Sequence, residues 1–558
     1  MPRRLDTFYC CFLKRSGLIR AIRGKILPSG IARRQVIAHT GSVSSPSVPL
    51  ASLSPAQRCF LYLTALVNGA AIMIVEILGA KMLAPYLGTS HFVWTAQIGV
   101  AMGSLAAGYY LGGRWADASV RLDRLFAGML VAALYLALTV VGVRFVAVAC
   151  LDFPLPLGSL LSSLFLFFVP LSLLAMTCPF LVRFLTHQLH TVGGAVGRLT
   201  SLSTVGSLVG TALIGYLLIP LAPNSVTMVV TAGLVALMAV LHFLFWARRP
   251  AVALGAAAAI GGAAFFAVNR DLHTQYTHVK QLYRGNSNFG QLQVVETLSG
   301  GMRFYVNDYL IQNTYVPQTR QSGSVFTYAL HGLARTHVEN PRSVLCIGLG
   351  VGIVPSLFAR EGVRVDVVEI NPAVVPVAEK FFDLDVSRMN LTFGDGRQFL
   401  NRCTNHYDAV VLDAFLGDSS PAHLMTREAF DSMRRVLNPE GVLVINCFGG
   451  TQHGKDFFLA SLSKTLRAAF DHVQLHAAES GNAFFVASAT PLRVFRTIDP
   501  QTIHPMVRED VVHVLARTRE TDPQHGRVLT DDFNPVEFHD AANRERIRRS
   551  LAKSMQEL

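Results

Sequence analysis

The amino-acid sequence predicts a multi-pass α-helical membrane domain followed by a doubly wound α/β sheet with a small β-rich lead-in. In the first half, apolar runs follow one another, each close to the ~20 residues that a helix needs to cross a bilayer. In the second half, short apolar strands alternate with amphipathic helices, which indicates a mostly parallel sheet covered on both faces. The composition agrees, because 51% of the residues are hydrophobic and only 15% are charged.

A basic tail opens the chain and occupies residues 1–57. Residues 1–58 hold ten Lys or Arg residues and one acid, Asp6, which accounts for most of the net charge of +13. Basic charge in a tail suits the anionic inner face of a membrane better than nucleic acid, so we expect no nucleic-acid partner. We interpret the tail as a disordered extension. A cleaved organelle transit peptide has the same Arg-rich, acid-poor composition and is the alternative.

Residues 58–268 are predicted to form a membrane domain of about seven helices. The apolar runs lie near 59–84, 92–112, 125–149, 158–182, 200–220, 225–246 and 251–268. Basic residues cluster in alternate loops, at Arg114, Arg121, Arg124, Arg183, Arg198, Arg248 and Arg249. The positive-inside rule then places the N-terminus and these loops in the cytoplasm, as in a multi-pass protein of the cell (inner) membrane.

Small and charged residues inside these runs predict further features. Three glycine pairs have the spacing of close helix contacts, namely Gly99 with Gly103, Gly108 with Gly112, and Gly206 with Gly210. Glu76 and Lys81 are charges within the first run, where charges are costly. They form either a structural pair, with snorkelling of Lys81 as a variant, or a membrane-facing substrate site.

Residues 270–340 are predicted to be the β-rich lead-in, with strands at 292–295 and 303–306. Residues 341–495 are predicted to form the sheet, and 496–558 a C-terminal tail. The expected strands of the sheet are 343–348, 364–370, 391–394, 407–412, 441–447, 472–477 and 483–488. The expected helices are 353–360, 372–381, 427–437 and 456–469.

The carboxyl ends of successive strands carry groups suited to a nucleotide-type ligand. The first strand runs into a turn with Gly348, Gly350 and Gly352, and the second ends at Glu369. Such glycines let backbone N–H groups approach a ligand, and such an acid can hold ribose hydroxyls. The next strands end at Asp395 with Gly396, and at Asp413 with Asp418 behind it. Because ligands bind at this edge of a doubly wound sheet, we predict one shared site there.

At this point the sequence resembles a known family. Gly348-Leu-Gly-Val-Gly352, Val368-Glu-Ile-Asn371, Gly394-Asp-Gly396, Val411-Leu-Asp-Ala414 and Leu437-Asn-Pro-Glu-Gly-Val442 follow in order the landmarks of spermidine synthases. The resemblance covers roughly residues 283–490, and segments 76–85, 108–117 and 529–537 look like the membrane-fused branch. No metal site is expected, because the eight cysteines are scattered without a CxxC pair or a His/Cys cluster.

The resemblance implies a Rossmann-like fold of the methyltransferase type and an aminopropyltransferase activity. The cosubstrate would be decarboxylated S-adenosylmethionine or S-adenosylmethionine itself, with no permanently bound cofactor. The partners would be a small-molecule amine acceptor, such as putrescine, and the lipid bilayer, and a homodimer is compatible with the family.

Carried over residue by residue, the nucleoside half of the family's site is intact. Glu369 matches the ribose-binding acid, and Asp395, beside Gly396, matches the acid that accepts from the adenine amino group. With the three glycines of the turn, Gln291 and Tyr328 complete the expected cosubstrate-binding set.

The amine half departs from the family at three positions. Val351 replaces the acid that binds the aminopropyl amine, Leu416 replaces the second acid of the catalytic loop, and Ala329 replaces a His or Gln. A dication such as putrescine needs nearby carboxylates, since a buried unpaired ammonium is costly. We therefore take Asp413 and Asp418 as the candidate catalytic base and amine binder.

Alternatives remain for function and for orientation. A methyltransferase, or another enzyme that uses intact S-adenosylmethionine, is one rival. A transporter or sensor with a non-catalytic nucleotide domain is the other, and converging polar groups inside the bundle would favour it. If the run at 251–268 crosses the membrane, everything after Asn269 lies outside. Because the cosubstrate is made inside, we favour a cytoplasmic soluble domain. The acidic tail residues Asp531, Asp532 and Glu537 form either a surface loop or a lid over the amine pocket.

Overall fold

The computed structural model describes most of the chain beyond the N-terminal tail. It covers residues 53–88, 90–186, 192–272, 278–308, 310–415, 421–452, 454–478, 481–522 and 524–535. Residues 1–52 of the predicted tail, together with Leu416, Asp418 and Glu537, lie outside these ranges.

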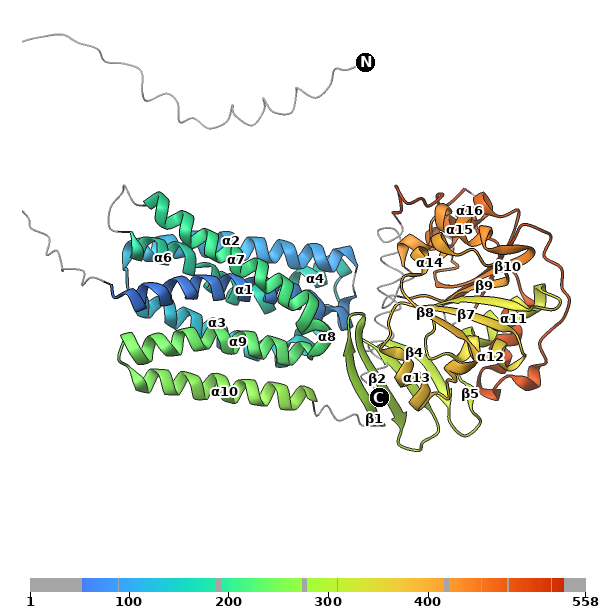
Figure 1. Cartoon of the computed structure of the whole chain (residues 1–558), viewed down its shortest axis with the longest axis horizontal. Coiled ribbons are helices and arrows are strands. Elements are labelled where there is room, and N and C mark those ends of the chain that lie inside the picture. The colour runs from blue at the N-terminus through green and yellow to red at the C-terminus, as the bar shows by residue number, and fades with distance from the viewer. Residues whose placement is uncertain are drawn as a thin grey trace, which may run out of the picture. The chain divides into compact units, whose positions relative to one another are not determined.

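The first part of the chain forms a bundle of long helices, drawn from blue to green in Figure 1. Its elements are α1 (Pro55–Leu87), α2 (His91–Ala118), α3 (Leu122–Cys150), α4 (Leu155–Ser163), η1 (Leu164–Phe168), α5 (Val169–Ala175), α6 (Thr177–Leu185), α7 (Val192–Leu213), η3 (Ile214–Leu218), α8 (Ile219–Leu221), α9 (Asn224–Leu241), η4 (His242–Trp246) and α10 (Pro250–Leu272). The segments η1, η3 and η4 are single π-helical turns that continue the helices before them.

Within the described residues, 6 helical stretches are long and apolar enough to cross a membrane, judged by length and composition. They correspond to all but one of the predicted apolar runs. The exception is the run at 92–112, which lies in α2, a helix of 28 residues outside that set.

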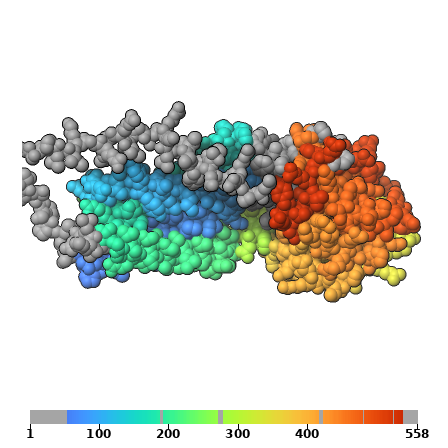
Figure 2. All heavy atoms as spheres, turned by 90° about the horizontal axis from the view of Figure 1, so that it is seen from above, coloured from blue at the N-terminus to red at the C-terminus, as the bar shows by residue number. Residues whose placement is uncertain are grey.

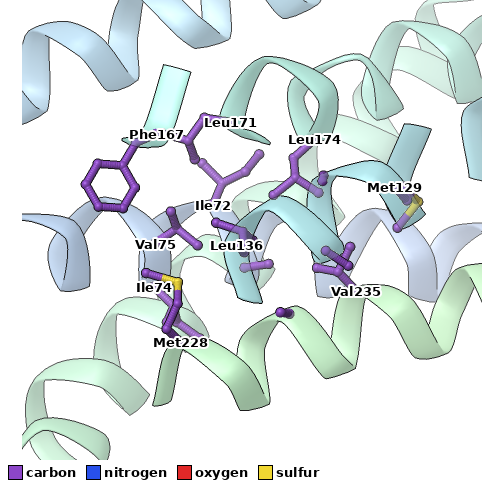
Figure 3. Close-up of a cluster of buried hydrophobic side chains, with 14 of the residues drawn as sticks. Ile72, Ile74, Val75, Met129, Leu136, Phe167, Leu171, Leu174, Met228 and Val235 are labelled. Atoms are coloured by element: carbon purple, nitrogen blue, oxygen red, sulfur yellow. The ribbon is translucent and has the colours of Figure 1, made fainter. Parts of the chain in front are cut away.

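One apolar cluster holds the bundle together, and part of it is shown in Figure 3. Val75, Leu136 and Leu171 are completely buried there and come from α1, α3 and α5. By contrast, only 17% of the apolar window of the α7 stretch and of the α10 stretch is buried within the protein. The outer helices thus present apolar side chains outward, as lipid-facing helices do.

Two of the three predicted glycine contacts are confirmed. A Cβ atom at Gly206 would lie 1.9 Å from the carbonyl oxygen of Leu66, and one at Gly108 would lie 2.4 Å from that of Ser172. The prediction for Gly99 and Gly103 is wrong, because a Cβ atom at either would meet nothing within 4 Å. Glu76 and Lys81 form no ion pair with each other or with another described residue, which removes the paired alternative, whereas snorkelling of Lys81 and a membrane-facing substrate site stay predictions.

The β-rich lead-in is confirmed as a 5-stranded antiparallel sheet with the strands in chain order. Its strands are β1 (Val279–Ser287), β2 (Gly290–Thr297), β3 (Arg303–Asn307), β4 (Leu310–Val316) and β5 (Gln321–Ser322). The helix α11 (Val325–His337) follows and connects this sheet to the larger one.

The predicted α/β sheet is confirmed as a 7-stranded sheet of order β11-β12-β10-β9-β6-β7-β8. Its strands are β6 (Ser343–Ile347), β7 (Arg364–Glu369), β8 (Asn390–Phe393), β9 (Tyr407–Leu412), β10 (Leu437–Phe448), β11 (His472–Ala477) and β12 (Asn482–Ser488). The strands β6 to β10 are parallel, whereas β12 runs antiparallel to both of its neighbours. The chain order reverses on either side of β6, which creates the switch point where doubly wound sheets bind ligands.

Alternation along each strand divides the core into two layers. Val344 and Cys346 face one layer, while Leu345 and Ile347 face the other. The first layer is covered by α11, α12 (Ile353–Arg360) and α13 (Val374–Phe381). The second is covered by α14 (Gly396–Arg402), α15 (Arg427–Arg435) and α16 (Phe457–Ala469). Apolar burial on both faces explains why these strands read as continuous apolar runs.

The last described residues, up to 535, pack on the α/β domain. After β12 come η7 (Pro500–Thr502), η8 (Pro505–Val507) and α17 (Arg508–Ala516), and then an extended segment. Figure 2 shows the red atoms of this C-terminal part against the orange surface of the domain.

Candidate active site

The glycine turn after β6 forms the floor of the site. Gly348, Gly350 and Gly352 have φ values of +100°, +55° and +80°, a region that side chains rarely adopt. A Cβ atom at Gly348 would also lie 2.2 Å from the carbonyl oxygen of Asp413. The turn therefore requires glycine for its backbone conformation and for its close approach to the end of β9.

Glu369 stands at the end of β7, beside this turn. Its Oε2 atom accepts a hydrogen bond from the Leu349 N–H at 2.9 Å, and its Oε1 atom accepts one from the Asn371 N–H at 2.7 Å. A carboxylate has about four acceptor positions, so each oxygen can still accept a ribose hydroxyl. Burial raises the pKa of Glu369, although the backbone N–H groups of Leu349, Asn371 and Ile370 act in the opposite direction. Glu369 thus shapes the turn as well as offering acceptors to a ligand.

The lead-in sheet supplies one side of the site. Asn371 donates from Nδ2 to the Ser287 hydroxyl at 3.1 Å, which joins the end of β7 to the end of β1. The backbone N–H of Gln291 donates to Oδ1 of Asp308 at 2.9 Å and fixes the start of β2 in the same hairpin. Gln291 therefore lies in the hairpin that Ser287 connects to Asn371, at the end of β7.

Asp395 caps the N-terminus of α14 and contacts a histidine. Its Oδ1 atom accepts from the Gln398 N–H at 2.9 Å, and its Oδ2 atom lies 2.8 Å from Nε2 of His423. Burial raises the pKa of Asp395, but the Gln398 N–H and His423 outweigh it and the net shift is downward. Asp395 is therefore held in its ionised form, and its contact with an adenine amino group stays a prediction. Sequence reasoning missed His423, and its place close behind the acid-rich loop after β9 is the only signal that could have found it.

Asp413 follows β9 and lies next to the glycine turn. Its N–H donates to the Ile347 carbonyl at 2.9 Å, and its Oδ1 atom accepts from Nδ2 of Asn446 at 2.9 Å. Asn446 in turn accepts from Nδ2 of Asn482 at 3.0 Å. Burial raises the pKa of Asp413 to about 6, despite the opposing hydrogen bond from Asn446. A carboxylate with such a pKa is suited to accept a proton near neutral pH.

Two of the three positions that depart from the family, Val351 and Ala329, lie in apolar surroundings, and the third, Leu416, is outside the described residues. Val351 is only 1% exposed and belongs to the apolar core, and Ala329 is completely buried in the same core. The charge that the family has at Val351 is therefore replaced by hydrocarbon. The candidate amine binder Asp418 lies outside the described residues, so its role stays a prediction.

Tyr328 is placed among apolar residues of the C-terminal part. It packs with Ile503, Val507 and Val511, and its hydroxyl donates to the Ser322 carbonyl at 3.1 Å. The His504 N–H donates to the same hydroxyl at 3.4 Å. These contacts give Tyr328 a packing role between α11 and α17, and its cosubstrate-binding role stays a prediction.

The fold and the site together define a doubly wound α/β domain with acids at the ends of three of the four contiguous strands β9, β6, β7 and β8. The family model of the spermine/spermidine synthase domain matches residues 325–478. A polyamine aminopropyltransferase of Vibrio vulnificus is 32% identical over 211 residues, which are 35% of this chain and 69% of that protein. The chain belongs to the spermine/spermidine synthase family, and its α/β part is an aminopropyltransferase-type enzyme domain.

This chain matches a smaller share of the length of two methyltransferase relatives. An N-terminal histidine N-methyltransferase of Emericella nidulans is 27% identical over 46% of this chain and 49% of that protein. A putrescine N-methyltransferase 2 of Nicotiana tabacum is 28% identical over 29% of this chain and 47% of that protein. Among solved structures, a spermidine synthase from Thermotoga maritima has 17% identity and a TM-score of 0.35, covering 47% of this chain and 88% of that one.

Proposed function

We propose that this protein is a membrane-bound aminopropyltransferase that moves the aminopropyl group of decarboxylated S-adenosylmethionine to an amine such as putrescine. The observation that carries the proposal is the convergence of Glu369, Asp395 and Asp413 on one edge of the sheet, around a glycine turn that cannot accommodate a side chain at Gly348. Glu369 and Asp395 are suited to bind a nucleoside, and Asp413 is suited to accept a proton.

The reaction would be a direct displacement. The amine nitrogen attacks the carbon next to the sulfonium, the new C–N bond forms as the C–S bond breaks, and methylthioadenosine leaves with the bonding electron pair. The attacking nitrogen loses one proton, which Asp413 accepts. Because the sulfonium is already a good leaving group, the enzyme mainly has to align the reactants and remove that proton.

Each acid would have its own role in this scheme. Glu369 would accept the two ribose hydroxyls on its free lone pairs, and Asp395 would accept from the adenine amino group. Asn446, itself oriented by Asn482, would fix the Asp413 carboxylate so that its other oxygen faces the amine.

Use of intact S-adenosylmethionine, with methyl transfer, is the second candidate, and Val351 favours it. Where the family has an acid that would repel a methionine carboxylate, this chain has a buried valine. Two of the relatives are named N-methyltransferases, which shows that related sequences support that chemistry.

The membrane attachment and its side are proposals too. The apolar helices would anchor the protein in the cell membrane, with the α/β domain in the cytoplasm where the cosubstrate is made. A transport or sensing role for the bundle is favoured by one observation. Gln97 in α2 is completely buried, and among the described residues neither of its amide atoms has a hydrogen-bond partner.

One experiment separates the two enzymatic candidates. The purified protein is incubated with decarboxylated or intact S-adenosylmethionine, with and without putrescine, and the products are identified by mass spectrometry. Methylthioadenosine formed only when an amine is present would support aminopropyl transfer. Formation of S-adenosylhomocysteine would assign methyl transfer, and the absence of both products would favour a non-catalytic nucleotide domain.

A further inference from the structure

The C-terminal segment of residues 524–535, here called the strap, is built into the α/β domain by backbone and side-chain contacts. Gly526 lies so close to α16 that a Cβ atom there would be 2.5 Å from the Ser461 nitrogen. Leu529 is completely buried in the core, and its N–H donates to the Thr465 hydroxyl at 2.9 Å. The Leu529 carbonyl accepts from the Arg427 N–H at 2.9 Å, at the first turn of α15. The strap therefore crosses α16 and reaches the N-terminus of α15.

Asp531 is the residue by which the strap contacts both α14 and α15. Its Oδ1 atom accepts from the hydroxyl of Thr426, the N-cap of α15, at 2.6 Å. Its Oδ2 atom accepts from Nη2 of Arg397, in the first turn of α14, at 2.9 Å. Arg397 is only 17% exposed at its side chain, so the loss of this carboxylate would leave a largely buried cation less well compensated.

The same contacts fix the short segment of residues 421–426, which follows the loop after β9. Arg397 donates from Nη1 to the His423 carbonyl at 3.2 Å, and Asn534 of the strap donates to the Ala422 carbonyl at 3.1 Å. His423 thus contacts Arg397 through its carbonyl oxygen, whereas its side chain lies 2.8 Å from Oδ2 of Asp395 through Nε2. The strap is therefore connected to the adenine-side acid through a continuous series of charge-assisted contacts.

We propose that Asp531 is a positioning residue for nucleoside binding, which holds residues 421–426 and His423 in register with Asp395. This proposal rests on the proposed function, because it takes Asp395 as the acid that accepts from the adenine amino group. The strap thus acts as a fixed outer support for the adenine side of the site. The two oxygens of Asp531 bond Thr426 and Arg397, so this residue supports α14 and α15. The alternative of a lid over the amine pocket stays a prediction, because Glu537 lies outside the described residues.

The chain offers a matched control in the next residue. Asp532 carries the same charge and is exposed, and it makes no hydrogen bond or ion pair with any described residue. Asp531→Asn and Asp532→Asn therefore change net charge equally and differ only in the contacts removed.

The test measures binding to the full-length protein in detergent by calorimetry, with methylthioadenosine and its 6-oxo analogue methylthioinosine as probes. Asp531→Asn should weaken methylthioadenosine binding by about two- to fivefold, as expected for a half-exposed charged network. Methylthioinosine lacks the amino group that Asp395 would accept from, so its affinity should change little. Asp531→Glu should restore part of the loss, and Asn534→Ala should act in the same direction with a smaller effect.

Three outcomes are distinguishable. If Asp531→Asn binds methylthioadenosine as well as Asp532→Asn does, while Glu369→Ala binds it poorly, the nucleoside site stands and the positioning role of Asp531 is wrong. If Glu369→Ala also leaves binding unchanged, the nucleoside site itself is misplaced and the proposed function fails with it. An equal loss for both probes in Asp531→Asn, with an altered unfolding temperature, would make Asp531 a structural residue only.

Discussion

Asn446 donates a hydrogen bond from Nδ2 to Oδ1 of Asp413 at 2.9 Å, across the neighbouring strands β10 and β9. Among the described residues, no hydrogen bond engages the second carboxylate oxygen of Asp413. The bond from Asn446 lowers the pKa of Asp413, which burial nevertheless raises to about 6. The candidate base is thus oriented by one neighbour and kept weakly acidic by its surroundings.

Asp413→Asn should reduce turnover by roughly 10²–10⁴, the usual contribution of general-base catalysis. The amide keeps the shape of the side chain and removes its proton affinity, so methylthioadenosine binding should stay close to normal. Mass spectrometry of the products measures the fall in turnover, and calorimetry measures the affinity for methylthioadenosine. Full activity in this variant would eliminate Asp413 as the base.

In the unchanged protein, turnover should rise with pH through about 6 as Asp413 ionises.

Asp413→Asn should also stabilise the protein at neutral pH. The folded-state pKa of about 6 lies above the ordinary value of 3.8, so the folded protein binds this proton more tightly than the unfolded chain does. The free energy of unfolding that comes from protonated Asp413 is then fully present below pH ~4. It is lost as the pH rises through about 6, because the buried carboxyl group then ionises. Thermal unfolding at pH 8 should show Asp413→Asn to be more stable, by at most about 3 kcal/mol. The two proteins should unfold alike below pH ~4, and equal stability at pH 8 would contradict the raised pKa.

Glu369→Ala should weaken methylthioadenosine binding by at least roughly tenfold, because two charge-assisted hydrogen bonds of about 1.5–3 kcal/mol each are removed. We also expect Glu369→Ala to disturb the glycine turn, since the Leu349 and Asn371 N–H groups lose their acceptor. Glu369→Gln retains one acceptor oxygen and should disturb the turn less. Calorimetry on both variants, with circular dichroism as the control for folding, separates ligand contacts from turn geometry.

Leu416→Asp should raise putrescine use, because it restores an acid that the family has in its catalytic loop and the dication needs carboxylates nearby. Val351→Asp should not serve as well, since Val351 is 1% exposed within the apolar core and a carboxylate there is costly. The measurement is kcat/KM for putrescine in each variant. No gain from Leu416→Asp would count against putrescine as the acceptor.

Gly206→Ala should destabilise the helical bundle, whereas Gly99→Ala should be neutral. The new Cβ atom at Gly206 would lie 1.9 Å from the Leu66 carbonyl oxygen, but at Gly99 it would meet nothing within 4 Å. Thermal unfolding in detergent compares the two variants, which carry the same added methyl group. Equal unfolding temperatures would show that α1 and α7 do not pack through this glycine.

Sequence patterns predicted the strands of the large sheet and its ligand-binding edge because each strand carries its own local signal. In β6 every residue is buried, so the apolar run and the following glycines mark the strand without tertiary information. Helix α11 is not among the predicted helices, and it contains Gly332. That glycine is explained only by packing, since a Cβ atom there would lie 2.5 Å from Ile498.

The partners of the site acids could not be predicted in the same way. Asn446 and Asn482 act together because β12 inserts beside β10, ahead of β11, in the sheet. That insertion follows from strand pairing over long sequence separations, which local propensity does not reveal. The contact of His423 with Asp395 likewise depends on how residues 421–426 return to the sheet edge.

The hydrogen bond between Asn371 and Ser287 has a mechanical consequence. Ser287 is the last residue of β1, a strand of 9 residues that begins at Val279, shortly after α10 ends at Leu272. A strand of that length spans about 30 Å and resists stretching, because its backbone is nearly extended. A displacement of Asn371 when a nucleoside occupies the neighbouring acid would therefore be passed to Ser287 and to the whole β1–β2 hairpin rather than absorbed at one residue.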